Sequence, residues 1–338
     1  MGDVDPVWRL DERLRALRPE PVALLGLANE CAWGTMDPVL LELVRLRIAS
    51  LIGNSDGLDR RSRAARDGGL SEEKIAAIPD YATSGEFSAT EQTCLAFTEQ
   101  CVIDVSGVSD DDRADLGTHF AADQVRGFVT ALYVTECTQR LELVSRLLLG
   151  GPSPGPDLVA SAAVPPAAGD VAAGLRAVLK EYQDAVMRGT DLDPVVTELV
   201  RLRCARTHDC RICKTLRLAD ARTAGADDEM TAKVDFYEHS DLDERTKIAL
   251  RITDAFITVP GALGAGVIAD ARSVFSESEL AELCLDITKW STQKIHVALG
   301  TDGADALPTS AQGVSFFSFD VEGRVAGYSA TLQQTPAR

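Results

Sequence analysis

Two cysteines, Cys210 and Cys213, form the pattern that most directly indicates chemistry in this sequence. They end the segment Cys210-Arg211-Ile212-Cys213, and eleven residues separate Glu198 from it. A spacing of three places both sulfur atoms on one face of a helix, close enough to join in a disulfide. If Cys210 opens that helix, the unpaired backbone N–H groups and the helix dipole stabilise a thiolate there. The pair therefore predicts thiol redox chemistry.

Two further side chains could tune this pair. Arg217 lies four residues beyond Cys213, one turn along the same predicted helical face, where its guanidinium would favour a thiolate. Glu198 would disfavour a thiolate by its charge, so its plausible use is proton transfer. That use requires Glu198 to be partly desolvated, so that its pKa rises.

The segment that carries Glu198 is one half of an internal repeat. Residues 36–69 (MDPVLLELVRLRIASLIGNSDGLDRRSRAARDGG) align without a gap with residues 192–225 (LDPVVTELVRLRCARTHDCRICKTLRLADARTAG), and ELVRLR is identical in both. The match resumes between residues 90–103 and 243–257, and again from Phe120 and Phe275 onward. The chain is therefore a duplication of one unit.

Each unit has the periodicity of helices. Aspartate followed by proline, at Asp37-Pro38 and Asp193-Pro194, is typical of a helix start, and an apolar stripe with a period near 3.6 residues follows. Capping-box spacing precedes further helices at Ser88 with Glu91 and at Ser276 with Glu279. We expect an all-α fold with no strand before residues 313–332.

Residues 313–332 contain two β-prone runs around Glu322-Gly323, which is typical of a hairpin. We expect no counterpart of this hairpin in the first copy. It would cap the second domain or pair with another chain.

Composition divides the chain further. We predict a helical domain without CxxC at 1–149, a Gly/Pro/Ala linker at 150–170, a helical domain with CxxC at 171–300, and a tail at 301–338. The two domains are expected to form an intramolecular pseudo-dimer. Pro165-Pro166 prevents a helix from continuing through the linker.

The charge of the chain excludes some partners. A formal net charge of −18 repels phosphate backbones and anionic lipid headgroups, so we expect neither nucleic acid nor membrane as a partner. The N-terminal residues have no apolar run of a secretory signal, and no stretch is long and apolar enough to span a membrane. We therefore expect a cytoplasmic protein. The other six of the eight cysteines are spaced like core residues.

The pattern Glu-x11-Cys-x2-Cys after an ELVRLR-type helix resembles the alkylhydroperoxidase D-like (AhpD-like)/carboxymuconolactone decarboxylase family over nearly all of residues 36–300. The resemblance implies an all-helical peroxidase or disulfide reductase, with Cys213 peroxidatic, Cys210 resolving and Glu198 in a proton relay. The histidine of the family relay is Arg217 here, and arginine cannot shuttle a proton at neutral pH. His208, in the loop before the pair, is then the substitute candidate.

The same resemblance implies partners. A peroxide or a small organic acid would be the substrate, a dithiol protein would supply electrons, and the fused pair would associate further into a homo-oligomer. No cofactor is implied. A structural zinc site needs four ligands, and the sequence has no second CxxC or HxxxH, so we predict no metal site. His208 with the two cysteines would supply three ligands, which leaves a metal as the alternative.

Two alternative functions remain open. The first copy has Asn54, Gly57 and Arg61 where the second has the cysteines and Arg217, so it cannot perform thiol chemistry. A non-redox decarboxylase, lyase or cyclase would instead use Glu42 or Glu198. The other alternative is a non-catalytic scaffold.

Overall fold

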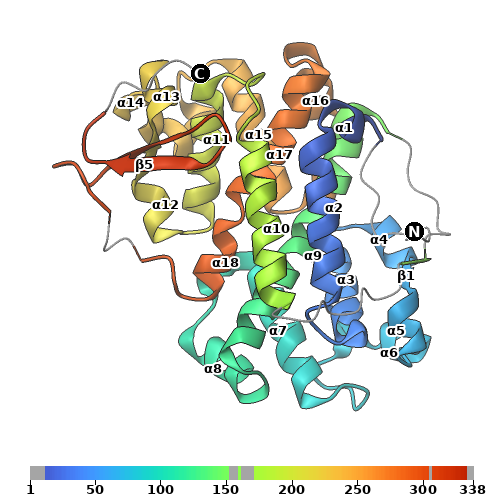
Figure 1. Cartoon of the computed structure of the whole chain (residues 1–338). Coiled ribbons are helices and arrows are strands. Elements are labelled where there is room, and N and C mark those ends of the chain that lie inside the picture. The colour runs from blue at the N-terminus through green and yellow to red at the C-terminus, as the bar shows by residue number, and fades with distance from the viewer. Residues whose placement is uncertain (1–11, 152–158, 161–170, 304–306, 333–338) are drawn as a thin grey trace.

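The computed structural model describes residues 12–151, 159–160, 171–303 and 307–332, and Figure 1 shows a helical molecule with one small sheet near the end of the chain. Residues 1–11, on which the expectation about a secretory signal rests, lie outside the described residues. So does most of the predicted linker, including Pro165 and Pro166. The predicted all-α fold is confirmed.

The first copy is a series of helices connected by short turns. After the short α1 (Glu12–Leu17), its order is α2 (Pro19–Trp33), α3 (Pro38–Leu51), α4 (Ser55–Asp59), β1 (Arg61–Ser62), α5 (Arg63–Asp67), α6 (Glu72–Ala76), η1 (Ile78–Asp80), α7 (Ala89–Asp104), η2 (Val105–Gly107), α8 (Asp110–His119) and α9 (Ala122–Leu149).

The second copy repeats this order. It comprises α10 (Val171–Val186), α11 (Pro194–Thr207), α12 (Arg211–Thr215), β3 (Leu216–Leu218), α13 (Ala219–Thr223), α14 (Asp228–Ala232), η3 (Lys233–His239), α15 (Glu244–Ile257), η4 (Pro260–Ala262), α16 (Ala265–Val274), α17 (Glu277–Trp290) and α18 (Gln293–Ala298). The duplication read from the sequence is thus a duplication of structure.

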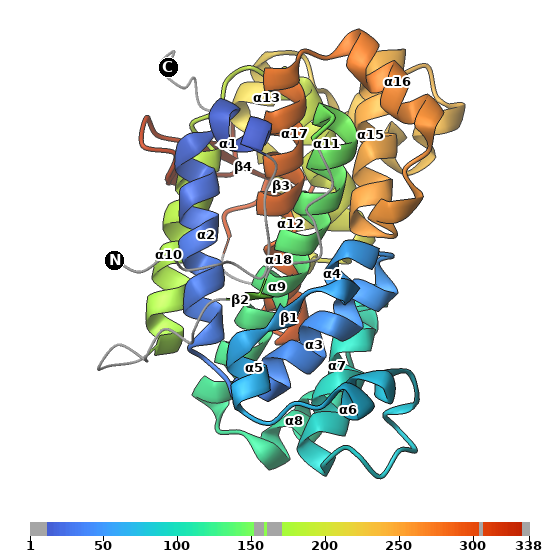
Figure 2. The ribbon, with the colours of Figure 1, turned by 90° about the vertical axis from the view of Figure 1, so that its right-hand side faces the viewer.

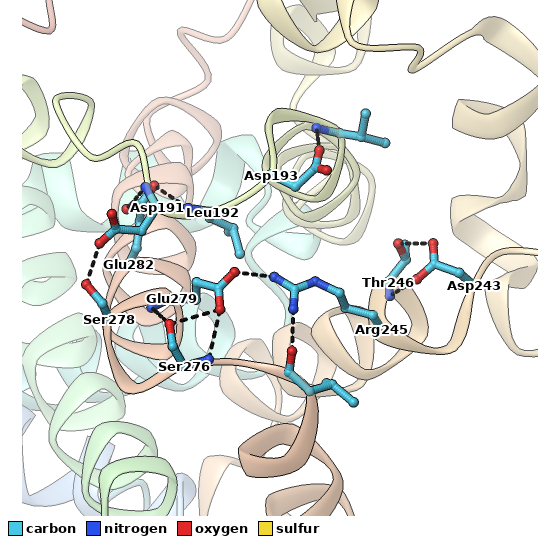
Figure 3. Close-up of polar contacts among 12 residues, drawn as sticks. Asp191, Leu192, Asp193, Asp243, Arg245, Thr246, Ser276, Ser278, Glu279 and Glu282 are labelled. Carbon is cyan, nitrogen blue, oxygen red and sulfur yellow. Dashed lines mark hydrogen bonds and ion pairs between the residues drawn. The ribbon is translucent and has the colours of Figure 1, made fainter.

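The predicted helix starts are confirmed at atomic detail. The Asp193 carboxylate accepts from the backbone N–H of Val195 at the start of α11. Ser276 and Glu279 form the reciprocal capping box of α17, which Figure 3 shows together with the ion pair from Arg245 to Glu279. Ser88 with Glu91 forms the matching box of α7. These caps satisfy backbone donors that a helix start leaves free.

The two copies pack against each other through a common hydrophobic cluster, and two further clusters of buried apolar residues lie mainly in the first copy. Helix α2 lies beside α10, and α9 lies beside α17, so equivalent helices of the two copies meet (Figures 1 and 2). The largest cluster of buried apolar residues runs through both copies and includes Leu25, Val134, Leu199 and Leu283. This pairing of equivalent helices is the arrangement of a pseudo-dimer within one chain.

Short strands complete both copies. The tail forms the predicted hairpin, with β4 (Ser315–Phe319) antiparallel to β5 (Val325–Ser329), and β4 also pairs in parallel with β3. In the first copy, β1 pairs in parallel with β2 (Val159–Ala160), which belongs to the segment after that copy. One expectation was therefore wrong, because β1, β2 and β3 precede the tail. The hairpin of β4 and β5 has no counterpart among the described residues of the first copy.

No helix in the described part of the chain is long and apolar enough to cross a membrane.

Candidate active site

The thiol pair begins where α11 ends in a tight left-handed turn. The backbone N–H of Cys210 donates to Ala205 at 3.0 Å and that of Asp209 donates to Arg206 at 3.1 Å, which is the pattern of a Schellman motif. Asp209 has a φ of 51°, a conformation that favours glycine, and the equivalent residue of the first copy is Gly53 with a φ of 73°. An aspartate thus holds a strained backbone position next to the thiols.

Cys210 caps α12, the short helix that contains Cys213. The Cys210 sulfur accepts a hydrogen bond from the backbone N–H of Cys213 at 3.4 Å, and both thiols are reduced. Asp302 accepts from two further backbone donors at this helix start: its carboxylate from the N–H of Arg211 at 2.8 Å, and its backbone carbonyl from the N–H of Ile212 at 3.1 Å. Cys210 is fully buried, whereas Cys213 is partly exposed.

The surroundings distinguish the two thiols. The pKa of Cys213 is lowered, chiefly because the Cys210 thiol donates a hydrogen bond to its sulfur, and Arg201 and Lys289 add positive charge nearby. The pKa of Cys210 is raised because it holds the shared proton and is buried. Cys213 is therefore the thiol of the pair that more readily loses its proton, and Cys210 is the one that keeps it.

Glu198 is held by an arginine. Its two carboxylate oxygens accept from Nε and Nη2 of Arg201 at 2.6 and 2.8 Å, and both side chains are buried. Arg201 also donates to the carbonyl of Cys213 at 2.9 Å and to that of Leu216. Glu198 thereby fixes Arg201, and Arg201 holds the segment that contains Cys213. No hydrogen bond among the described residues joins Glu198 to either sulfur.

The same clamp exists in the copy without thiols. Glu42 accepts from Arg45 at 2.7 and 2.8 Å, and Arg45 donates to the carbonyls of Gly57 and Arg60. Because the clamp is present where no thiol exists, its general role is to hold the loop after the helix.

Arg217 does not lie on the helix of the cysteines, so the expectation of one continuous helical face was wrong. Helix α12 ends at Thr215, and Arg217 is the middle residue of β3. Its guanidinium donates to the carbonyls of Lys214 and Leu216, at 2.8 and 2.7 Å, and its buried Nε has no partner among the described residues. The pairing of β3 with β4 overrides the helical spacing.

His208 lies between the two copies. Its Nδ1 is 3.2 Å from Nε2 of Gln293, and its pKa is lowered well below the ordinary range, first by burial and then by Lys294 and Arg140. Both cations bind Glu136 of the first copy. In the described residues no hydrogen bond links His208 to either thiol.

Two residues of α17 that the sequence reasoning missed lie at the site. Lys289 is buried against the Trp290 ring, 2.9 Å from its centroid, and 5.0 Å from that of Phe319. Asp286 lies one turn earlier and accepts from the Thr197 hydroxyl at 3.3 Å. Comparing the two copies could have revealed these residues. The first copy has the apolar residues Ala131 and Val134 where the second has Asp286 and Lys289.

Aromatic side chains of the hairpin cover the site. Arg201 lies 5.6 Å from the Phe317 ring centroid, and Phe317 and Phe319 pack edge-on at 5.5 Å. Tyr328 of β5 stacks on Phe317, and its pKa is raised by burial and by the nearby Cys213. The tail thus caps the second copy over the thiol.

No group of three His, Cys, Asp or Glu side chains in the described ranges could hold a metal ion.

Known proteins match both copies to different extents. The sequence model of the carboxymuconolactone decarboxylase family matches residues 22–100, in the first copy. An uncharacterised protein of Mycobacterium tuberculosis strain CDC 1551 is 34% identical over 238 residues, which cover 70% of this chain and 81% of the relative. An uncharacterised protein of strain H37Rv matches to the same extent. The chain has no significant match among solved structures.

Proposed function

The chain belongs to the carboxymuconolactone decarboxylase family, and we propose that its second copy is a thiol-dependent oxidoreductase that reduces peroxides or disulfides through Cys213 and Cys210. The observation that carries this proposal is the asymmetry of the pair. The Cys210 thiol donates to the Cys213 sulfur, and Arg201 and Lys289 add positive charge beside it. A partly exposed thiolate next to a protonated thiol is suited to oxidation in two steps.

Reaction with a hydroperoxide would proceed in two steps, oxidation of Cys213 and then formation of the disulfide. The Cys213 thiolate attacks the terminal oxygen, the O–O bond breaks, and the released alkoxide takes one proton to become an alcohol. Cys213 is then a sulfenic acid. Cys210 attacks that sulfur, and the hydroxyl leaves as water with the proton of the Cys210 thiol. The thiols lose two electrons, the peroxide gains two, and a dithiol protein would later return two electrons and two protons.

The bonding of the two glutamates argues against the non-redox alternative. Glu42 and Glu198 each direct both carboxylate oxygens to an arginine, so neither is placed as a free base. The scaffold alternative does not explain the pKa values of the cysteines. Burial raises the pKa of Cys204 and of Cys284 to about 12, whereas the pKa of Cys213 is lowered.

The decisive experiment measures the alkylation rate of each cysteine against pH, followed by peptide mass spectrometry before and after a stoichiometric pulse of alkyl hydroperoxide. Cys31 is an internal control, because it is partly exposed like Cys213 but its pKa is raised. We expect Cys213 to react first, at a lower pH, and to form a disulfide with Cys210 after the pulse. If Cys213 reacts no faster than Cys31 and ignores both peroxide and a small disulfide, the proposal is wrong.

A further inference from the structure

The reaction of Cys213 needs a group that takes its proton and gives one to the leaving alkoxide. Glu198 is bound by Arg201, Arg217 cannot release a proton at neutral pH, and His208 points to the interface between the copies. Resting on the proposed thiol function, we propose that Lys289 and Asp286 of α17 form the proton relay of Cys213, with a small cavity as its opening to solvent.

Lys289 has the position and the freedom that this role requires. No ion pair or hydrogen bond among the described residues engages its amine, which lies on the Trp290 ring. Arg201, which binds the Cys213 carbonyl, approaches the same ring, at 5.9 Å. Lys289 also lowers the pKa of Cys213, and burial lowers the pKa of Lys289 itself well below the ordinary range. Burial therefore favours the neutral amine, which is the form that can accept a proton.

Asp286 lies one turn before Lys289 on α17 and lines a cavity. A cavity of about 150 Å³ has the exposed Thr190 and Pro194 at its rim and Thr197, Asp286 and Phe319 among its inner residues. Asp286 is 2% exposed, and the described residues offer its carboxyl one hydrogen bond, from Thr197. Burial, reinforced by the charge of Glu282, raises its pKa to about 8. A carboxyl with that pKa can pass a proton between water in the cavity and the lysine.

The first copy provides an internal comparison. Where the second copy has Thr197, Asp286 and Lys289, the first has Leu41, Ala131 and Val134, all buried in the apolar core. The helical frame therefore does not need polar groups at these positions. Burying a carboxyl and an amine costs free energy, and the chain bears that cost in the copy that has the thiols.

The charges around the relay come from four elements. Besides Cys213 on α12, Lys289 interacts with Asp286 on its own helix, Arg201 on α11 and Asp184 on α10. Asp286 interacts with Glu282 and Lys289 on α17, with Thr197 on α11 and with Arg18 before α2. Arg18 and the backbone N–H of Asp191 bind Glu282, whose contact with Asp191 is visible in Figure 3.

Proton transfer through this relay closes the balance of the reaction. The neutral Lys289 amine takes the Cys213 proton as the thiolate forms, and the resulting ammonium gives a proton to the alkoxide when the O–O bond breaks. This transfer returns Lys289 to its neutral form, so the proton of the alcohol is the one that Cys213 released. Between turnovers, Asp286 allows Lys289 to exchange protons with water in the cavity.

The test exchanges the relay for the residues of the first copy. Asp286→Ala and Lys289→Val are compared with Asp286→Asn. Lys233→Met serves as a matched control, because it removes a lysine of η3 that pairs with Glu229 and Asp241, neither of which acts on the relay. The rate of Cys210–Cys213 disulfide formation with an alkyl hydroperoxide is measured against pH, together with the thermal unfolding midpoint. A Lys289→Ala variant is also assayed with added methylamine, which supplies an amine to the space that the side chain leaves.

We expect the three relay variants to lose at least about tenfold in rate, to unfold no earlier than the wild type, and to show an altered pH profile. Methylamine should restore part of the rate of Lys289→Ala, and Lys233→Met should match the wild type. Rates within about twofold of a reactive wild type would overturn the relay alone. The relay would also be overturned if the variants lose rate in proportion to their loss of thermal stability and methylamine restores none of the rate of Lys289→Ala. A wild type that forms no disulfide would instead refute the proposed thiol function, and the relay with it.

Discussion

Asn54 and Cys210 occupy equivalent positions, and each caps the short helix after it by accepting a hydrogen bond from the backbone N–H three residues later. The bond is 2.9 Å to the Asn54 oxygen and 3.4 Å to the Cys210 sulfur. Sulfur is a weak acceptor, whereas asparagine is among the best capping residues. The second copy therefore has a poorer cap at the position where the proposed chemistry needs a thiol.

The capping roles of Cys210 and Asn54 predict that substituting each residue by the other type has opposite effects on the stability of the chain. Cys210→Asn should stabilise the chain by about 0.5 kcal/mol or more while abolishing disulfide formation, and Asn54→Cys should destabilise it by about 1 kcal/mol. Urea unfolding of both variants measures the pair of changes. A Cys210→Asn variant less stable than the wild type would show that the thiol does more than cap α12.

The left-handed residue before the thiols predicts a second stabilising change. Asp209→Gly should raise the free energy of unfolding by about 0.5–1 kcal/mol, because glycine adopts positive φ without strain. Gly53→Ala is the matched change in the first copy, and we expect it to destabilise by about 1 kcal/mol. Thermal unfolding compares the two. If Asp209→Gly destabilises the chain as Gly53→Ala does, the ion pair of Asp209 with Lys214 outweighs the backbone strain.

The arginine clamps allow the structural and chemical roles of Arg201 to be separated. Arg201→Lys and Arg45→Lys should each cost about 3 kcal/mol, because lysine cannot form the two parallel bonds to the buried glutamate. We expect only Arg201→Lys to change the pH dependence of Cys213 alkylation. An identical change in Arg45→Lys would show that the effect is a general loosening of the fold.

Asp286 predicts how stability depends on pH. Its pKa is raised to about 8, against about 3.9 for an ordinary aspartate, so the folded state keeps a proton that the unfolded chain releases. Its contribution to stability is fully present below about pH 4 and declines up to about pH 8. Asp286→Ala should therefore gain stability relative to the wild type across that range, by at most about 1.4 kcal/mol per pH unit. Denaturant unfolding at several pH values checks this, and a constant difference would contradict the raised pKa.

The sequence predicted the helices well because their signals are local. The aspartates before Pro38 and Pro194 and the serine–glutamate boxes act within one turn, and each was found where expected. Strands β1 and β3 escaped notice because they are two and three residues long and pair with segments far along the chain. Arg217 was misplaced for the same reason.

The candidate site was only partly visible in the sequence. The thiols and Glu198 stand in one readable motif, but Asp286 and Lys289 look like ordinary polar residues of an amphipathic helix. Their burial follows from the hairpin, whose Phe319 covers them, and from α11, whose Thr197 binds Asp286. Neither contact has a local signature.

The pairing of β3 with β4 also sets an order of events during synthesis. A chain emerging from the ribosome folds its early segments first, so the first copy and the helices of the second can form before β4 exists. Until residues 315–319 have emerged, the backbone of β3 is an unpaired edge that other chains could join, and the aromatic cover over Cys213 is missing. A nascent chain, or one truncated before β4, would thus expose the Cys213 sulfur without this cover, so a thiol of α12 depends for its protection on a strand that is translated well after it.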